Sequence, residues 1–118
     1  PSPAVLPAAG QGALALQTRA DDAALIAALA PLNDDATMRA ARAERTVLAE
    51  LGGGCAIPLG VLATVEGPRL TLSAALCHPA GGEIVREQMT ADETPEAVGR
   101  AMAARLRARA AHFLADLR

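Results

Sequence analysis

The fold of this chain is decided at ten residues near its middle, Leu51-Gly52-Gly53-Gly54-Cys55-Ala56-Ile57-Pro58-Leu59-Gly60. The pattern before them predicts a helix, and the pattern after them predicts a strand. Three consecutive glycines end the helix and give the backbone access to positive φ, and Pro58 stiffens the exit into the apolar run that follows. A loop of this kind presents the thiol of Cys55 instead of burying it. We therefore expect the chemistry of this chain at Cys55.

The helix before this hinge is predicted over about residues 35–51, with polar caps at residues 33–35 and with Gly52 closing it. At about 100° per residue its apolar side chains share one face, and Glu44 falls in the middle of that face. A buried carboxylate is costly unless it has a partner or an opening to water. We favour a structural ion pair, or a helix edge at a domain contact, over a catalytic role for Glu44.

The N-terminal part is predicted to contain one strand and one short helix. Residues 12–19 combine alanines with two leucines, a composition that suits a buried strand following the loop at residues 6–12. Asp21 or Asp22 is expected to cap a helix that ends near Pro31.

Three strands are predicted after the hinge, at about residues 59–66, 69–77 and 83–90. The connections between them are short and turn-rich, so we expect an antiparallel meander. Along the middle strand, apolar residues alternate with polar or small ones, which gives one strongly apolar face that helices should cover. The residues on that face are Leu70, Leu72, Ala74 and Leu76.

The last predicted helix has Thr94 as its cap and Pro95 at its first position. Arg100 and Arg107 lie opposite its apolar stripe, on a predicted solvated face. The stripe consists of Val98, Met102, Leu106, Ala110, Phe113 and Leu117. The predicted fold class is α+β: a three-stranded antiparallel sheet covered on one face by helices and preceded by one extra N-terminal strand.

Composition limits the classes of function. The chain has 118 residues, which is enough for one domain, and its net charge of −2 gives no sign of binding to nucleic acid or to an anionic membrane. All eleven basic residues are Arg, which excludes a Lys Schiff base and a P-loop lysine. No apolar run reaches the roughly 18–20 residues of a membrane span. The chain begins at Pro1, and we expect it to start partway through a longer protein.

The thiols and imidazoles are few. Cys55 and Cys77 are too few for a disulfide framework and lack the paired spacing of a zinc site. We expect two reduced thiols in a cytoplasmic protein and no bound metal. His78 and His112 are isolated in the sequence, form no metal-binding or catalytic constellation, and are expected to be structural.

Three separated motifs follow one another along the chain. They are Leu6-Pro7-Ala8-Ala9-Gly10-Gln11-Gly12-Ala13-Leu14-Ala15-Leu16, then Ala43-Glu44-Arg45 with Leu48 and Leu51, and then Gly53-Gly54-Cys55 with Pro58 and Gly60. In this order they resemble the C-terminal part of porphobilinogen deaminase, also called hydroxymethylbilane synthase. The resemblance covers nearly the whole chain but only the last part of the family's three-domain proteins. It implies that residues 1–19 are a loop and strand of the preceding domains and that residues 20–118 form the cofactor-carrying C-terminal domain.

The same resemblance implies a site. Cys55 is expected to carry a dipyrromethane cofactor through a thioether. Four porphobilinogen units are added to its free end with loss of ammonia, and hydrolysis releases hydroxymethylbilane for tetrapyrrole and heme biosynthesis. Gly54, Gln11 and Gly12 are implied to lie against cofactor or substrate. From the residues alone, Gly-Gln-Gly is a weak signal that equally fits a turn leading into a strand.

The resemblance also places the catalytic aspartate and most substrate-binding basic residues in N-terminal domains, so no catalytic residue is assigned in this chain. The expected partners are those domains, porphobilinogen and the growing tetrapyrrole. The intact transferase is expected to be a cytoplasmic monomer, and this chain alone is expected to be inactive.

Two other hypotheses stay open from the sequence. One is a free-standing binding module in which Cys55 has no function, and the other is a redox-responsive domain that uses Cys55 and Cys77 within bridging distance. A domain separated from its partners predicts instead an exposed apolar patch where they dock. In that case the strand at residues 12–19 is expected to be disordered, paired elsewhere or satisfied by a neighbouring molecule.

Overall fold

The computed structural model describes residues 4–52 and 57–114 of the chain. Its elements in chain order are α1 (Ala23–Leu29), the 3-10 turn η1 (Ala30–Leu32), α2 (Asp35–Glu50), β1 (Leu59–Glu66), β2 (Arg69–Cys77), β3 (Ile84–Ala91), α3 (Pro95–Arg109) and α4 (Ala111–Leu114).

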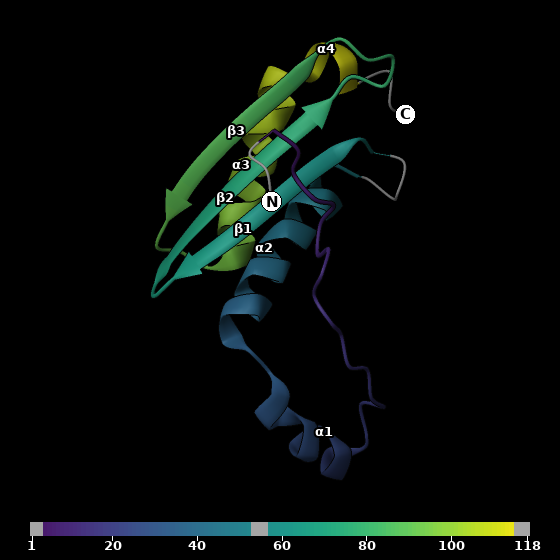
Figure 1. The fold of residues 1–118 in the computed structure, drawn as a ribbon, viewed down its shortest axis with the longest axis vertical. Coiled ribbons are helices and arrows are strands. Elements are labelled where there is room, and N and C mark those ends of the chain that lie inside the picture. The colour runs from purple at the N-terminus through teal and green to yellow at the C-terminus, as the bar shows by residue number, and fades with distance from the viewer. Residues whose placement is uncertain (1–3, 53–56, 115–118) are drawn as a thin grey trace.

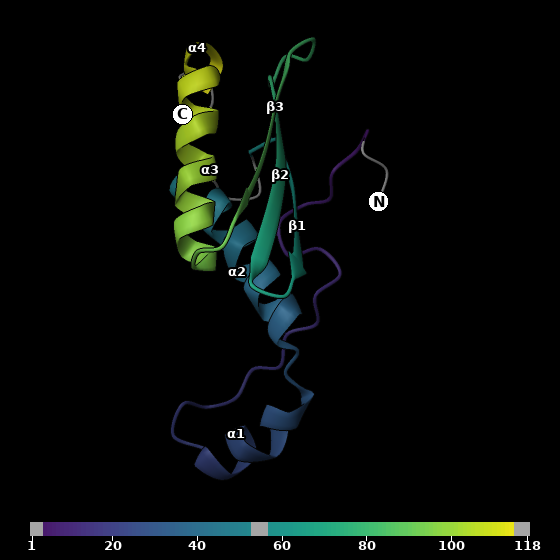
Figure 2. The same cartoon turned by 90° about the vertical axis from the view of Figure 1, so that its left-hand side faces the viewer.

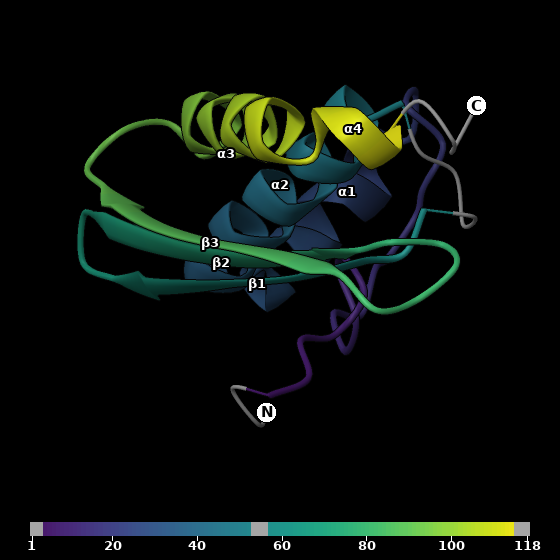
Figure 3. The ribbon, with the colours of Figure 1, turned by 90° about the horizontal axis from the view of Figure 1, so that it is seen from above.

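The strands form one antiparallel sheet in the order β1-β2-β3 (Figure 1). In its register, Leu72 of β2 lies opposite Ala63 of β1 and Met89 of β3. The helices α2 and α3 cover one face of the sheet, and the N-terminal segment crosses the other face (Figure 2, Figure 3). The predicted α+β class and the predicted meander are confirmed.

The hydrophobic core lies between the sheet and the helices α2 and α3. Fully burying a side chain the size of leucine contributes roughly 1.5–3 kcal/mol to folding. The predicted core residues that are buried are Leu70, Leu72, Ala74, Leu76, Val98, Met102, Leu106 and Ala110. The predicted stripe also included the side chain of Phe113 and Leu117, and these lie outside the described part of the structure.

Helix boundaries follow local capping chemistry. Asp34 accepts the N–H of Thr37 at 2.7 Å and so caps α2, and Thr94 caps α3 in the same way at 3.3 Å. The predicted bounds of β1 and β2 are confirmed, whereas β3 begins one residue later than predicted and the last helix breaks at Ala110 before α4. None of the described helices combines the length and the apolar character needed to cross a membrane.

The predicted N-terminal strand at residues 12–19 is wrong. These residues have no regular secondary structure, and Leu14 is 98% and Leu16 64% exposed. A strand is stable only where another strand satisfies its backbone groups, and in the described part of the chain no strand pairs with this segment. It runs instead as exposed chain to α1, which lies beyond the end of the sheet and buries none of its residues (Figure 1).

The helices α2 and α3 approach each other closely at Gly99 of α3. A Cβ atom at this position would lie 2.6 Å from Cβ of Thr46 and 2.7 Å from the carbonyl oxygen of Ala43. Both atoms belong to α2 and move only if the helix moves. The missing side chain of Gly99 therefore sets the spacing between the two helices.

Replacing Gly99 by Ala is expected to lower the free energy of unfolding by about 1–3 kcal/mol, because the added methyl group pushes α3 away from α2. At an exposed helical position the same change stabilises a helix by up to about 1 kcal/mol, so the sign of the effect tests the contact. Urea denaturation measures it. Ala104→Gly, at an exposed position of α3, controls for helix propensity, and a gain in stability for Gly99→Ala would contradict the close approach.

The cap of α2 makes the stability of the chain depend on pH. Hydrogen bonds from the side chain and the N–H of Thr37 hold the pKa of Asp34 below its ordinary value of 3.8. A carboxyl group with a lower pKa in the folded state stabilises the fold above its unfolded value, and this contribution is lost as the pH falls through the folded value. Asn caps a helix about as well as Asp but does not titrate.

We therefore expect Asp34→Asn to match the parent chain in urea denaturation at about pH 7 and to be the more stable of the two at about pH 3. Asp92→Asn, at an exposed loop position, controls for the loss of one negative charge. An equal gain at low pH in that variant would show that the cap is not the cause.

Candidate functional site

The predicted anchor Cys55 and its neighbour Gly54 lie in residues 53–56, outside the described residues. The structure does describe both ends of this connection. At the first end, Gly52 adopts a φ of 75°, which turns the chain away from α2. At the second end, the carbonyl of Pro58 accepts the N–H of Cys77 on β2 at 3.0 Å. The connection therefore leaves α2 at the predicted glycine and returns to a position held by the sheet.

Glu44 of α2 is a buried carboxylate, only 6% exposed. One of its oxygens accepts the N–H of Ala63 on β1 at 2.8 Å, and the other accepts the N–H of Gly10 at 2.7 Å. Hydrogen bonds to an ionised carboxylate are short and strong, and two of them offset much of the cost of removing the charge from water. The partner of Glu44 is thus a pair of backbone amides, where the sequence favoured an ion pair or a helix edge at a domain contact.

Gln11 and Gly12 lie in a loop made of two consecutive turns. The N–H of Gln11 donates to the carbonyl of Ala8 at 3.0 Å, and the N–H of Ala13 donates to the carbonyl of Gly10 at 3.2 Å. Gly10 and Gly12 have φ values of 73° and 87°, in the left-handed region that such turns require at their third residue. Oε1 of Gln11 also accepts the N–H of Ala8 at 3.0 Å. The turn interpretation of this motif therefore describes its local structure.

The N-terminal segment before this loop lies along the free edge of β1. The N–H of Val61 donates to the carbonyl of Pro7 at 2.8 Å. At Gly60 a Cβ atom would lie 2.9 Å from both Cβ and the carbonyl oxygen of Leu6, so the glycine permits the close approach. The N–H of Ala63, two residues further along this edge, donates to Glu44 of α2. Backbone amides at the beginning of the β1 edge are therefore hydrogen-bonded by two different parts of the chain, the N-terminal segment and α2.

Arg107 of α3 lies at the C-terminal end of α2. It donates to the carbonyl of Glu50, the last residue of α2, and lies 3.9 Å from the Glu50 carboxylate. A cation is favourable there because the last carbonyls of a helix carry partial negative charge. Sequence reasoning missed this contact, since helical periodicity shows that Arg107 is off the apolar stripe but not that another helix ends beside it.

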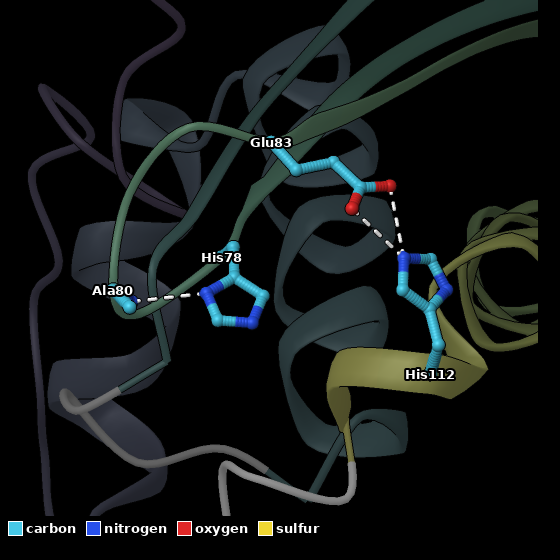
Figure 4. Close-up of polar contacts among 4 residues, drawn as sticks. All are labelled: His78, Ala80, Glu83 and His112. Atoms are coloured by element: carbon cyan, nitrogen blue, oxygen red, sulfur yellow. Dashed lines mark hydrogen bonds and ion pairs between the residues drawn. The ribbon is translucent and has the colours of Figure 1, made fainter.

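His78 and His112 make local contacts in the described structure (Figure 4). Nδ1 of His78 accepts the N–H of Ala80 at 3.0 Å in the turn before β3, and Nε2 of His112 lies 2.9 Å from both carboxylate oxygens of Glu83. No cluster of three or more His, Cys, Asp or Glu side chains suited to a metal ion occurs among the described residues. The structure gives no distance between Cys77 and Cys55, so the redox hypothesis gains no geometric support.

A shallow hollow of about 350 Å³ lies where the N-terminal segment crosses the sheet. It contains none of the site residues predicted from the sequence, and Arg86 donates there to the carbonyl of Ala4 at 2.7 Å. The hollow is lined by Leu6, Ser73, Ala74, Arg86, Glu87 and Gln88. We regard this hollow as part of the surface against which the N-terminal segment packs.

Known proteins resemble the chain over most of its length. The family model for the C-terminal domain of porphobilinogen deaminase matches residues 38–108. The porphobilinogen deaminase of Thiobacillus denitrificans is 43% identical over 112 residues, which cover 94% of this chain and 37% of that protein. The Chromobacterium violaceum protein of the same name is 45% identical over 102 residues, covering 86% of this chain and 33% of that protein. That of Synechococcus elongatus is 37% identical over 117 residues, covering 98% and 37% respectively.

The chain spans about a third of the length of these relatives. The family match includes the motif at residues 43–45 and the glycine hinge with Cys55, two of the three motifs on which the resemblance was based. It runs from α2 through the sheet into α3, so it covers the core of the described fold. The chain therefore belongs to the porphobilinogen deaminase family and contains its C-terminal domain.

Proposed function

We propose that this chain is the part of a porphobilinogen deaminase that carries a dipyrromethane cofactor, bound through a thioether to Cys55. The observation that carries the proposal is the family match over residues 38–108, which includes the connection between α2 and β1 on which Cys55 lies. A covalently tethered cofactor is held in place only if the protein holds the two ends of the segment that carries it. Here these ends are Gly52, which follows α2, and Pro58, which is hydrogen-bonded to β2, and we call them the base of the tether.

The surroundings of Cys55 in the sequence suit a permanent bond better than a thiolate nucleophile. Cys55 follows the C-terminus of α2, where the partial negative charge of the helix does not favour a thiolate. No His or Lys adjoins it in the sequence to stabilise a thiolate. A thioether, once formed, needs no such stabilisation.

This chain's contribution is to hold the cofactor. When bound, the dipyrromethane supplies the free pyrrole end to which four porphobilinogen units are added with loss of ammonia, before hydrolysis releases hydroxymethylbilane. Cys55 is the proposed covalent attachment, and Gly54 is proposed to lie against the cofactor. Gln11 and Gly12 are the proposed contacts with the pyrrole side chains. Because Oε1 of Gln11 already accepts the N–H of Ala8, the exposed Nε2 is the group that would donate to an acetate or propionate.

The remaining parts of a longer enzyme are the proposed partners, together with porphobilinogen and the growing tetrapyrrole. We assign residues 1–19 to the preceding domains and residues 20–118 to the C-terminal domain. The exposure of Leu14, Leu16 and Leu32, at 98%, 64% and 68%, supports a docking surface in this region. The intact protein is proposed to be a cytoplasmic monomer, and the chain alone to be inactive, because the catalytic aspartate and most substrate-binding basic residues are expected in those other domains.

The test joins this chain to the N-terminal two-thirds of the Thiobacillus denitrificans relative, in place of the matching C-terminal part. The joined protein is expected to carry an adduct of dipyrromethane mass on Cys55, measured as intact mass with mapping of the modified peptide, and to convert porphobilinogen to hydroxymethylbilane. Cys55→Ser is expected to remove both the adduct and the activity, since serine cannot form the thioether.

Cys77→Ser is the matched control, because it removes the other thiol of the chain and is expected to retain the adduct. A second joined protein, built with the Chromobacterium violaceum relative, guards against a misfit between the two parts. Absence of the adduct from both unsubstituted proteins, or its persistence in Cys55→Ser, would contradict the proposal.

A further inference from the structure

Glu44 stands out among the charged side chains because it joins three parts of the chain through two bonds. It belongs to α2, it holds Ala63 of β1, and it holds Gly10 of the N-terminal loop, which precedes it by 34 residues. The carboxylate is nearly buried, so water competes little for these bonds. The family match and the chemistry proposed for Cys55 assign it no role.

The three joined parts frame the connection that carries Cys55. Glu44 lies about two turns before Gly52, where the chain leaves α2, and Ala63 lies four residues after Leu59, where β1 begins. Gly10 precedes Gln11, the proposed contact with the pyrrole carboxylates. One side chain thus links α2, which leads into the connection, to β1, which follows it, and links the loop to both.

We propose that Glu44 is a positioning residue, which sets the base of the Cys55 tether and the place of the Gln11 loop through its bonds to the amides of Ala63 and Gly10. The inference rests on the proposed function. It assigns Glu44 no contact with cofactor or substrate. Its effect reaches the cofactor only through the backbone of β1, the end of α2 and the loop.

A carboxylate is needed here because both partners are donors. Each N–H meets its own oxygen, at 2.8 Å and 2.7 Å. Glutamine has nearly the same shape but offers one accepting oxygen and one donating NH₂ group, so one of the two amides would face a donor. Glu44→Gln therefore breaks one of the two attachments while it leaves the volume of the side chain unchanged.

The experiment measures hydrogen exchange and cofactor loading in the joined protein with the Thiobacillus denitrificans relative. In Glu44→Gln, amide exchange in peptides covering residues 8–13 or 59–66 is expected to rise by about tenfold to a hundredfold, while exchange in β2 is unchanged, because a hydrogen bond to a charged group is lost. The rate at which the dipyrromethane adduct appears on Cys55 is expected to fall by about tenfold, because even a displacement of about 1 Å of a positioned reacting group can lower a rate by up to about 100-fold.

Val47→Ala is the matched control, since Val47 is a fully buried core residue one turn further along α2 and makes neither of the two hydrogen bonds. It is expected to raise exchange in all these peptides together and, at equal fraction folded, to load cofactor at the rate of the parent protein. Loading at the parental rate in Glu44→Gln, or exchange that rises evenly across the sheet, would overturn the positioning role and leave the anchor at Cys55 standing. An unmodified thiol in the parent protein would overturn both proposals.

Discussion

The buried carboxylate of Glu44 holds the N-terminal loop, α2 and the edge of β1 together. A charge that is 6% exposed is unfavourable unless both oxygens find donors, and a backbone amide shielded from water is unfavourable unless it finds an acceptor. The bonds from Ala63 and Gly10 meet both requirements at once. Ala9 of the loop packs against the hydrophobic core, and the carbonyl of Pro7 just before the loop accepts the N–H of Val61, whereas Gly10 and Gly12 have no side chains to pack and Gln11 is exposed. The position of the loop is therefore set by the hydrogen bonds to α2 and β1 together with the packing of Ala9.

Each edge strand of the small sheet is contacted by a charged side chain from one of the two covering helices. On β1, Glu44 of α2 accepts from Ala63, and on β3, Arg109 of α3 donates to the carbonyl of Arg86 at 3.2 Å and pairs with Glu87 at 2.5 Å. Unpaired strand edges invite pairing with another chain. A three-stranded sheet has edges for two of its three strands, so protecting them matters more here than in a wide sheet. The helices thus supply the apolar cover of the sheet and also protection for its edges.

Local signals in the sequence were enough for most of the fold. Asp34 and Thr94 indicate where α2 and α3 begin, and the alternation of residue types in β2 indicates which face of the strand is buried. Both features can be predicted because they depend only on residues close together in the sequence. The strand at residues 12–19 was wrongly predicted since its composition suits a strand but no described strand pairs with it. Local sequence patterns could not predict the amide partners of Glu44 or the carbonyl partner of Arg107, because these contacts join residues far apart in the sequence. The proposed anchor at Cys55 rests on a sequence motif and the family match, because its position lies outside the described residues.

Under the proposed function, a cofactor that stays bound while its product lengthens requires that the fold hold both ends of the connection on which Cys55 lies. The fixed base is visible on both sides: α2 ends against Arg107, and the chain returns beside β2 through the bond between Pro58 and Cys77. Glycine restricts φ and ψ least of all residues, so Gly52 can adopt the positive φ at which the chain turns away from α2. A bulky residue at Gly52 would be strained by its φ of 75°. The end of α2 therefore combines a carbonyl held by Arg107 with a glycine that turns the chain toward the connection on which Cys55 lies.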